Sequence, residues 1–238
     1  MKIDFLELEN FKGIKHQVLE LNCKSGVLFG ANGVGKSTVL EAINILFAPI
    51  INKITFNKFK QVDNLDIEDI KFGESKTKIS VKLKMSEMHN IEFKYHRMLE
   101  RKTGKRTHFS ADLDMITRDF NNVYMNDENT NMPIYANYGT HRAVQVVKIQ
   151  RKSNRHTFDK LSAFEKAIEN KIDFRMFFEW FREQQEFENS IKVNEDDTYV
   201  DRELNCAKKA VLTMLSKEVF SDIKIMFSPL RMVATKDN

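Results

Sequence analysis

Glycine, lysine and hydroxyl residues follow one another between Gly30 and Ser37 in an order suited to binding phosphate. The segment Gly30-Ala31-Asn32-Gly33-Val34-Gly35-Lys36-Ser37 fits the pattern G-x-x-x-x-G-K-[ST] at every position. Glycines let backbone N–H groups converge on phosphate oxygens without Cβ clashes. A helix that begins near Lys36 would aim its positive end at the same anion. The residue types therefore predict a loop that binds a nucleoside triphosphate.

Each polar side chain of this loop has an expected role. We expect Lys36 to bridge the β- and γ-phosphates and Ser37 to be a Mg²⁺ ligand. Thr38 should contact the α-phosphate. The expected ligands are ATP and Mg²⁺, and Lys36 is a candidate catalytic residue. The expected binding residues are Gly30, Ala31, Asn32, Gly33, Val34, Gly35, Lys36, Ser37 and Thr38.

The elements next to the loop follow from hydrophobic periodicity. Residues 2–8 and 16–22 alternate apolar and polar side chains, which predicts an antiparallel hairpin. The apolar run 26–29 predicts a strand buried on both faces that leads into the loop. After the loop, a helix should place Val39, Leu40, Ile43, Leu46 and Phe47 on one face. We expect Pro49 to end this helix.

Further elements are predicted along the rest of the chain. Residues 76–85 and 91–99 alternate strongly and should be strands, and residues 107–115 should add a third. Residues 133–144 suggest a short strand followed by a turn. The stretches 161–188 and 201–215 have helical periodicity. Residues 223–229 and 231–235 predict a final pair of strands.

The loop and its setting resemble the ABC-type head ATPases of the SMC, RecF and OLD group. The similarity rests on G-A-N-G-V-G-K-S-T-V-L-E-A-I and on Asn10-Phe11-Lys12-Gly13, which matches N-F-[KR]-G about twenty residues earlier. It implies an α/β P-loop NTPase of the ABC-ATPase head type, with a mixed sheet, an antiparallel β subdomain and added helices. It also implies that Lys12 lies near the phosphates. The alternative for Lys12 is a solvated turn residue.

Two later segments extend the resemblance. Ile134–Ala143 is similar to the strand end that replaces the Q-loop in OLD-like and defence-associated ATPases, which implies that Tyr138 and Arg142 sense the γ-phosphate and Mg²⁺. A buried charge partner is the alternative for Arg142. Residues 174–188 resemble a helix of bacterial anti-phage ATPases of the Septu and retron-associated type, which work beside a nuclease. Core packing is the simplest role for Trp180.

Two motifs of ABC-type catalysis are not evident. The segment Leu161-Ser162-Ala163-Phe164-Glu165 has the outline of a signature helix but carries Phe where glycine is needed. Asp127-Glu128 follows a stretch too short and polar for a Walker B strand. We therefore expect residues 1–238 to form an N-terminal lobe, with a helical segment at about 157–216, completed by further chain or by a partner. Alone, it should bind nucleotide but hydrolyse it poorly.

Charge and cysteine content limit the partners only weakly. The net charge is +4, and basic clusters occur at residues 94–106 and 142–160, which suit either DNA or a solvated surface. The acidic run 195–197 should be a solvated loop. Cys23 and Cys206 lack metal-ligand spacing and indicate reduced thiols. With no signal peptide and no apolar run of membrane-spanning length, we expect a cytoplasmic protein.

Two functions from different classes remain open. The leading one is an ATPase head that acts in DNA repair or anti-phage defence, with Mg-ATP bound between two heads of a homo-oligomer and a nuclease as partner. The alternative is a non-hydrolysing module in which bound ATP controls assembly or a partner protein. Measuring ADP release against retention of ATP separates them. A small-molecule kinase fits poorly, because such kinases lack the N-F-K-G hairpin.

Overall fold

The computed structural model describes residues 2–55, 64–85, 91–109, 134–138, 174–215 and 219–236, together with 114, 118, 122, 161, 164, 167 and 168. The chain divides into two compact units. Unit 1 comprises Met1–Tyr138 and Asp159–Glu169, and unit 2 comprises Gly139–Phe158 and Asn170–Asn238. The phosphate-binding segment lies in unit 1.

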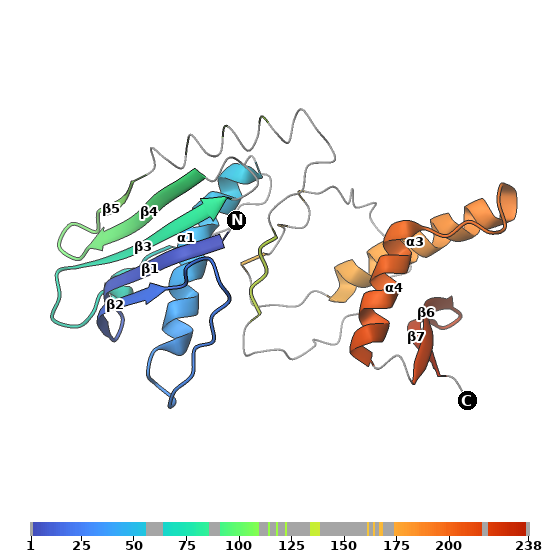
Figure 1. The fold of residues 1–238 in the computed structure, drawn as a ribbon, viewed down its shortest axis with the longest axis horizontal. Helices are drawn as coiled ribbons and strands as arrows, with labels where there is room; N and C mark the ends of the chain where they lie inside the picture. Colours follow the sequence, from blue (N-terminus) through green and yellow to red (C-terminus); the bar gives the residue numbers. More distant parts are fainter. Residues whose placement is uncertain are drawn as a thin grey trace. The chain divides into compact units, whose positions relative to one another are not determined.

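Unit 1 contains an antiparallel sheet in the order β2-β1-β3-β4-β5 (Figure 1). Its strands are β1 (Lys2–Phe11), β2 (Ile14–Glu20), β3 (Lys76–Met85), β4 (Ile91–Glu100) and β5 (Arg106–Phe109). The predicted opening hairpin and the two long alternating strands are confirmed. The third predicted strand ends early, at Phe109, and Asp114 is helical. Alternation is a reliable signal here because one face of the sheet is buried and the other is not.

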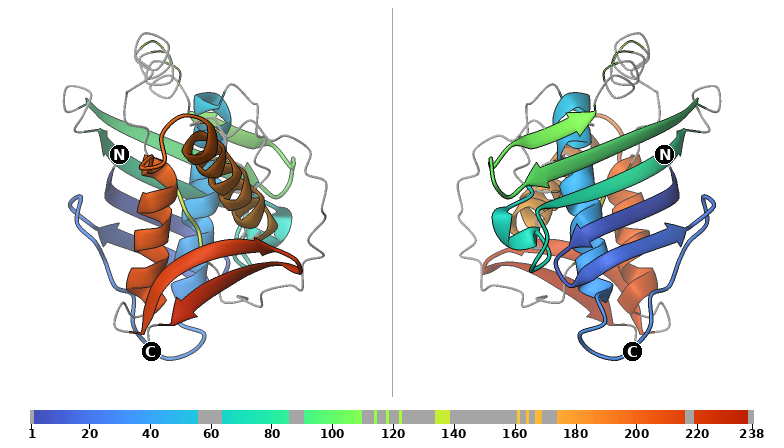
Figure 2. Two further views of the ribbon diagram at one scale, coloured as in Figure 1. Left: turned by 90° about the vertical axis from the view of Figure 1, so that its right-hand side faces the viewer. Right: turned by 90° about the vertical axis from the view of Figure 1, so that its left-hand side faces the viewer.

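The core of unit 1 lies between this sheet and helix α1 (Lys36–Ile54), which crosses one face of it (Figures 1 and 2). Strand residues such as Leu6, Ile79 and Leu83 pack there, and Leu46 packs from the helix. The predicted apolar face of the helix is correct except at Leu40, which is 51% exposed. The described region thus places the glycine-rich loop at the N-terminus of a helix anchored along its length.

Pro49 does not end helix α1, contrary to the sequence-based expectation. The helix continues to Ile54, although proline has no N–H to donate to the carbonyl of Ile45. Arg97 on β4 takes over this role, because its Nη1 donates to the Ile45 oxygen at 2.8 Å. Its Nη2 donates to Asn64 Oδ1 at 2.7 Å. A buried arginine therefore satisfies the carbonyl that the proline would otherwise leave unpaired.

Unit 2 is built from helices α3 (Phe174–Asn194) and α4 (Arg202–Leu215) and the antiparallel hairpin of β6 (Phe220–Phe227) and β7 (Leu230–Lys236). Its core contains Phe178, Phe181, Leu204, Ile223 and Ile225. The predicted second helix and final strand pair are confirmed. The first helix begins at Phe174 rather than Leu161, and Leu161 lies in a 3-10 turn. Trp180 packs against Phe177 and Phe181, as expected for a core residue.

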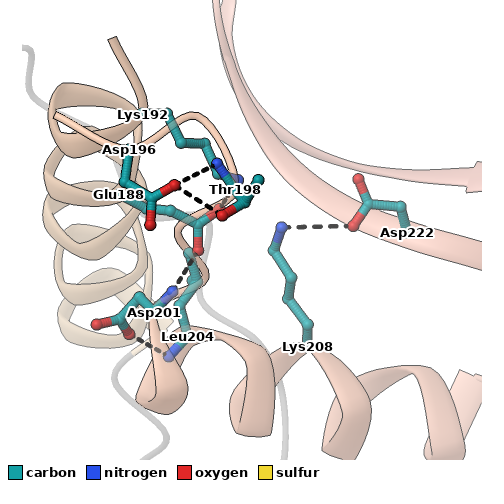
Figure 3. Close-up of polar contacts among 8 residues, drawn as sticks. All are labelled: Glu188, Lys192, Asp196, Thr198, Asp201, Leu204, Lys208 and Asp222. Atoms are coloured by element: carbon teal, nitrogen blue, oxygen red, sulfur yellow. Dashed lines mark hydrogen bonds and ion pairs between the residues drawn. The ribbon is translucent and has the colours of Figure 1, made fainter. Parts of the chain in front are cut away.

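A polar network joins α3 to α4 (Figure 3). The carboxylate of Glu188 accepts hydrogen bonds from Lys192 Nζ at 2.6 Å and from the Asp201 backbone N–H at 2.9 Å. Asp201 in turn caps α4, since its Oδ1 accepts the Leu204 N–H at 2.7 Å. The acidic run at residues 195–197 lies in the connecting turn, where Asp196 accepts two bonds from Thr198. The expectation of an exposed loop for this run is confirmed.

Besides the apolar core, the side chain of Gln185 links α3 to the hairpin of unit 2 by two hydrogen bonds. The amide of Gln185 donates to the Ile225 carbonyl at 3.0 Å and accepts the Ile225 N–H at 2.8 Å. Replacing Gln185 by leucine should lower the free energy of unfolding of unit 2 by about 2 kcal/mol, because two buried backbone groups lose their partner. Urea unfolding followed by the fluorescence of Trp180, the single tryptophan, measures this change.

Gln184→Leu is the matched control, since Gln184 is the neighbouring residue on α3 and is only half-buried. It should leave the unfolding midpoint nearly unchanged. Equal destabilisation by both substitutions would show that the Gln185 bonds are not the cause.

Among the described helices, α1 alone has a length and apolar content compatible with crossing a membrane, and 56% of the qualifying window is buried. The expectation that no segment has the length and apolar content to cross a membrane is therefore too strict. A core helix that is buried against a sheet can have the same apolar composition.

Candidate functional site

The loop between residues 30 and 36 has a positive φ, which glycine adopts most readily, at the three glycines Gly30, Gly33 and Gly35. Gly33 has φ 87° and Gly35 has φ 99°, both in the left-handed region. Gly35 is also the residue that precedes α1, and its carbonyl accepts the Val39 N–H at 3.0 Å. A Cβ at Gly35 would lie 3.4 Å from Ile14 Cδ1. The loop therefore passes close to β2 and turns sharply into the helix.

Lys36 folds back over the loop. Its ammonium donates to the carbonyl oxygens of Gly30 at 2.8 Å and Ala31 at 2.7 Å. Lysine has three N–H donors, so an ammonium in this position can still donate to an anion in the loop. The ammonium of Lys36 thus lies against the segment in which the sequence predicts phosphate.

The first turn of α1 is suited to an anion because no residue within the turn neutralises the positive end of the helix. It contains no acidic residue, and no side chain caps its N–H groups. The helix dipole and the unpaired amides therefore point at the loop without compensation. Ser37 is exposed and Thr38 is half-buried on this turn, and Ala31, Asn32 and Val34 are exposed in the loop. The structure brings all nine predicted residues of the segment 30–38 together.

The segment before the loop differs from the prediction. Residues 26–29 form no strand, and Val27 and Phe29 are 85% and 91% exposed. A strand buried on both faces requires a hydrogen-bonded neighbour at its edge. No described strand pairs with these residues. Their apolar composition is correct for burial, but the described part of the chain does not bury them.

A pocket of about 320 Å³ opens beside the loop. It is lined by Ile14 and Leu19 of β2, by Val27 and Phe29, and by Gly35 and Lys36 of the loop. The phosphate-binding segment and an apolar surface are therefore contiguous. Such a combination suits a ligand with an anionic part and an aromatic part.

Lys12 lies in the turn between β1 and β2 and is not a solvated turn residue. Its ammonium pairs with the carboxylate of Glu41 on α1 and lies 3.5 Å from Asp69 Oδ1. Burial lowers the pKa of Lys12, but the hydrogen bond and charge of Glu41 and the charge of Asp69 outweigh it, so the pKa is raised. Lys12 therefore remains charged at neutral pH.

The second predicted motif is only partly described. Tyr138 is 69% exposed, Arg142 lies outside the described residues, and residues 134–138 form no strand. Tyr135, which has no role predicted from the sequence, packs its ring on Phe47 at 4.9 Å between centroids. Its hydroxyl donates to Asn44, a buried polar residue of α1. An asparagine within an apolar helix face was the available sequence signal for this contact.

The first basic cluster consists of Lys94, Arg97, Arg101, Lys102, Lys105 and Arg106. Its three arginines serve internal contacts. Arg97 is buried against α1, Arg101 donates to the carbonyls of Glu74 and Ile70, and Arg106 donates to the carbonyl of Leu65 and to Asp66. These arginines order the segment 64–74. The second cluster, at residues 142–160, lies entirely outside the described residues.

Of the two segments that only partly match catalytic motifs, the structure describes residues of the signature-like one, 161–165. Phe164 is 3% exposed in the core of unit 1, which agrees with its unsuitability for a signature helix. Asp127 and Glu128 lie outside the described residues. Among the residues that the structure describes, no group of His, Cys, Asp and Glu side chains has the arrangement of a metal site.

Most of the chain is similar to known proteins. The model of a family described as an AAA domain matches residues 6–209. The chain is similar to the "Retron Ec83 probable ATPase" of Escherichia coli, at 24% identity over 237 residues. This match covers 94% of the chain but 42% of the relative, so the chain spans about two fifths of the length of that protein.

Several solved structures are also similar. An SMC ATPase, from work on "ATP-driven dimerization and DNA stimulated activation", has a TM-score of 0.37 and 20% identity, and the match covers 49% of this chain and 78% of that chain. The recombination mediator protein RecF with ATP has a TM-score of 0.36 and 22% identity, covering 45% and 26%. With TM-scores below 0.5, these similarities do not bear on the function of this chain.

Proposed function

This chain belongs to the AAA domain family, and on that premise we propose that it binds Mg-ATP at residues 30–38 as part of an ATP-hydrolysing head. Family membership confirms the predicted P-loop NTPase fold class. The observation that carries the proposal is that Lys36, the glycine turn and the uncompensated start of α1 lie together at the segment 30–38. These groups supply the charge, the amides and the dipole that a triphosphate requires.

Each residue of the segment has a proposed role. Lys36 would move from the carbonyls of Gly30 and Ala31 to the β- and γ-phosphates. Ser37 would bind Mg²⁺ through its hydroxyl, and Thr38 would contact the α-phosphate. The ion would neutralise charge on the phosphates. Tyr138 and Arg142 remain proposed sensors of the γ-phosphate.

The proposal extends to hydrolysis and partners by analogy. The relative in Escherichia coli carries the name probable ATPase, which supports hydrolysis here. Among the described residues, no carboxylate contacts Lys36 or Ser37. We therefore propose that the acid that polarises the attacking water comes from a second head or from another segment. From the family resemblance, we further propose that the head acts in DNA repair or anti-phage defence, beside a nuclease.

Removing Mg²⁺ tests the metal part of the proposal. Mg-ATP should bind the 238-residue chain in calorimetry, and EDTA should weaken binding by roughly tenfold or more, because the ion shields the phosphates and links them to Ser37. Ser37→Ala should remove most of the difference between ATP with and without Mg²⁺. Ser25→Ala, at an exposed serine before the loop, is the matched control and should retain it.

Phosphate release from bound ATP, measured on the chain together with the second head or further segment that supplies the acid, separates the two candidate functions. Formation of ADP with Mg²⁺, absent in EDTA, supports the ATPase head. Retention of intact ATP through many hours would favour the ATP-controlled module. Affinity for ATP that is indifferent to both Mg²⁺ and Ser37 would contradict the proposed site.

A further inference from the structure

We propose that Glu41 and Asp69 are positioning residues that hold the ammonium of Lys12 beside the first turn of α1, where it contributes to binding the nucleotide phosphates. This inference rests on the proposed function. It assigns roles to two carboxylates that the motif does not include.

The backbone of the turn that carries Lys12 is fixed from outside the hairpin. Lys12 has φ 51°, a left-handed conformation that is uncommon for a side-chain-bearing residue. Its N–H donates to the Asp69 carbonyl at 2.7 Å, and the Lys71 N–H donates to the Asn10 carbonyl at 2.9 Å. A bridge between Phe11 and Ile70 completes this contact. The segment 66–71 therefore holds the turn, and Lys12 starts from a defined backbone position.

The side chain of Lys12 is held by two carboxylates from different elements. Glu41 comes from α1 and pairs directly with Nζ, and Asp69 Oδ1 lies 3.5 Å away. Asp69 is itself oriented, because its Oδ2 accepts the Asp66 N–H at 2.8 Å. Among the described residues, Glu41 accepts a hydrogen bond from the ammonium and Asp69 forms a longer ion pair, so these carboxylates engage at most two of its three N–H groups. One N–H is left to donate to an anionic ligand.

The position of Glu41 on α1 places this ammonium near the proposed phosphates. Glu41 follows Ser37 by four residues, so the two side chains share a face of the helix, separated by a rise of about 6 Å. Side chains on a helix lean toward its N-terminus, which directs Glu41 toward Ser37. Independently, Ile14 approaches Gly35 closely, so the hairpin turn adjoins the loop. Both observations bring Lys12 to the border of the loop.

Holding a lysine in advance favours binding. A free lysine side chain loses rotamer freedom when it contacts a ligand, and this loss opposes binding. Glu41 and Asp69 restrict the side chain before the ligand arrives. The raised pKa of Lys12 agrees with a permanently charged group in this role.

A double-mutant cycle on Mg-ATP affinity tests the inference, using calorimetry on the full 238-residue chain. Lys12→Met should weaken binding roughly tenfold, as expected for loss of a hydrogen bond to a charged group. Glu41→Gln should weaken it roughly threefold to tenfold through lost positioning. The variant with both changes should bind about as Lys12→Met does, because Glu41 acts through Lys12.

Glu9→Gln is the matched control. Glu9 pairs with Lys78 at 3.7 Å and has an exposure close to that of Glu41, but it lies on the sheet surface. It should leave affinity unchanged. Tighter binding by Glu41→Gln would mean that the carboxylate competes with phosphate, and losses that multiply in the double variant would mean independent action. Either result overturns the inference. It is also overturned if Lys12→Met binds Mg-ATP with unchanged affinity. This last measurement tests the inference even if Glu41→Gln does not fold.

The same measurements distinguish this inference from the proposed function. Wild-type binding that is lost in Lys36→Ala supports the site itself. If the wild type binds and Lys12→Met has no effect, only the positioning role fails. If the wild type does not bind Mg-ATP, both fail.

Discussion

Replacing Lys36 by alanine should weaken Mg-ATP binding by at least about a hundredfold. The ammonium would form charge-assisted hydrogen bonds to two phosphates, each contributing about 1.5–3 kcal/mol. The loss of both corresponds to at least two orders of magnitude in Kd. Calorimetric titration of wild-type and variant chains with Mg-ATP measures the difference.

The fold should tolerate this change. Among the described residues, the hydrogen bonds of the Lys36 ammonium go to the carbonyls of Gly30 and Ala31, and the residue is half-buried. Lys24→Ala is the matched control, since Lys24 is an exposed lysine that precedes the loop. It should keep wild-type affinity. Binding by the Lys36 variant at wild-type strength would remove the basis for a phosphate site at residues 30–38.

Replacing Arg97 by leucine should lower the free energy of unfolding of unit 1 by about 3 kcal/mol, because a buried group that loses its hydrogen-bond partner costs about 1–3 kcal/mol. Arg97 is 9% exposed, and its loss leaves the Ile45 carbonyl and the Asn64 side chain without this donor. Urea unfolding followed by far-UV circular dichroism measures the change.

Pro49→Ala provides the sharpest control for this prediction. Alanine restores an N–H four residues after Ile45, so the helix can satisfy the carbonyl without Arg97. Arg97→Leu should therefore cost roughly 1–2 kcal/mol less in the Pro49→Ala background than in the wild type. An identical cost in both backgrounds would show that Arg97 does not compensate for the proline.

The structure also changes the interpretation of positive charge in this chain. In the sequence, residues 94–106 suggest either a DNA-binding patch or a solvated surface. The structure assigns Arg97, Arg101 and Arg106 to internal carbonyls and a carboxylate instead. The three lysines of this cluster are exposed. Salt-dependent DNA binding, if it is observed, should therefore map to residues other than these arginines.

Features that depend on local pattern can be predicted from the residues alone. Alternation predicted β3 and β4, because each residue of a strand faces the core or solvent in turn. The G-x-x-x-x-G-K-S pattern predicted the loop and the start of α1, because backbone conformation at Gly33 and Gly35 is a local property. Family membership at residues 6–209 agrees with this fold class.

Features that depend on distant partners became known only from the folded chain. Whether Pro49 ends a helix depends on Arg97, which lies 48 positions away and supplies the missing donor. Whether residues 26–29 become a strand depends on an edge with which to pair. The placement of Lys12 between Glu41 and Asp69 depends on three separate segments. Hydrogen bonds and ion pairs form between groups that are close in space, and sequence distance does not report that closeness.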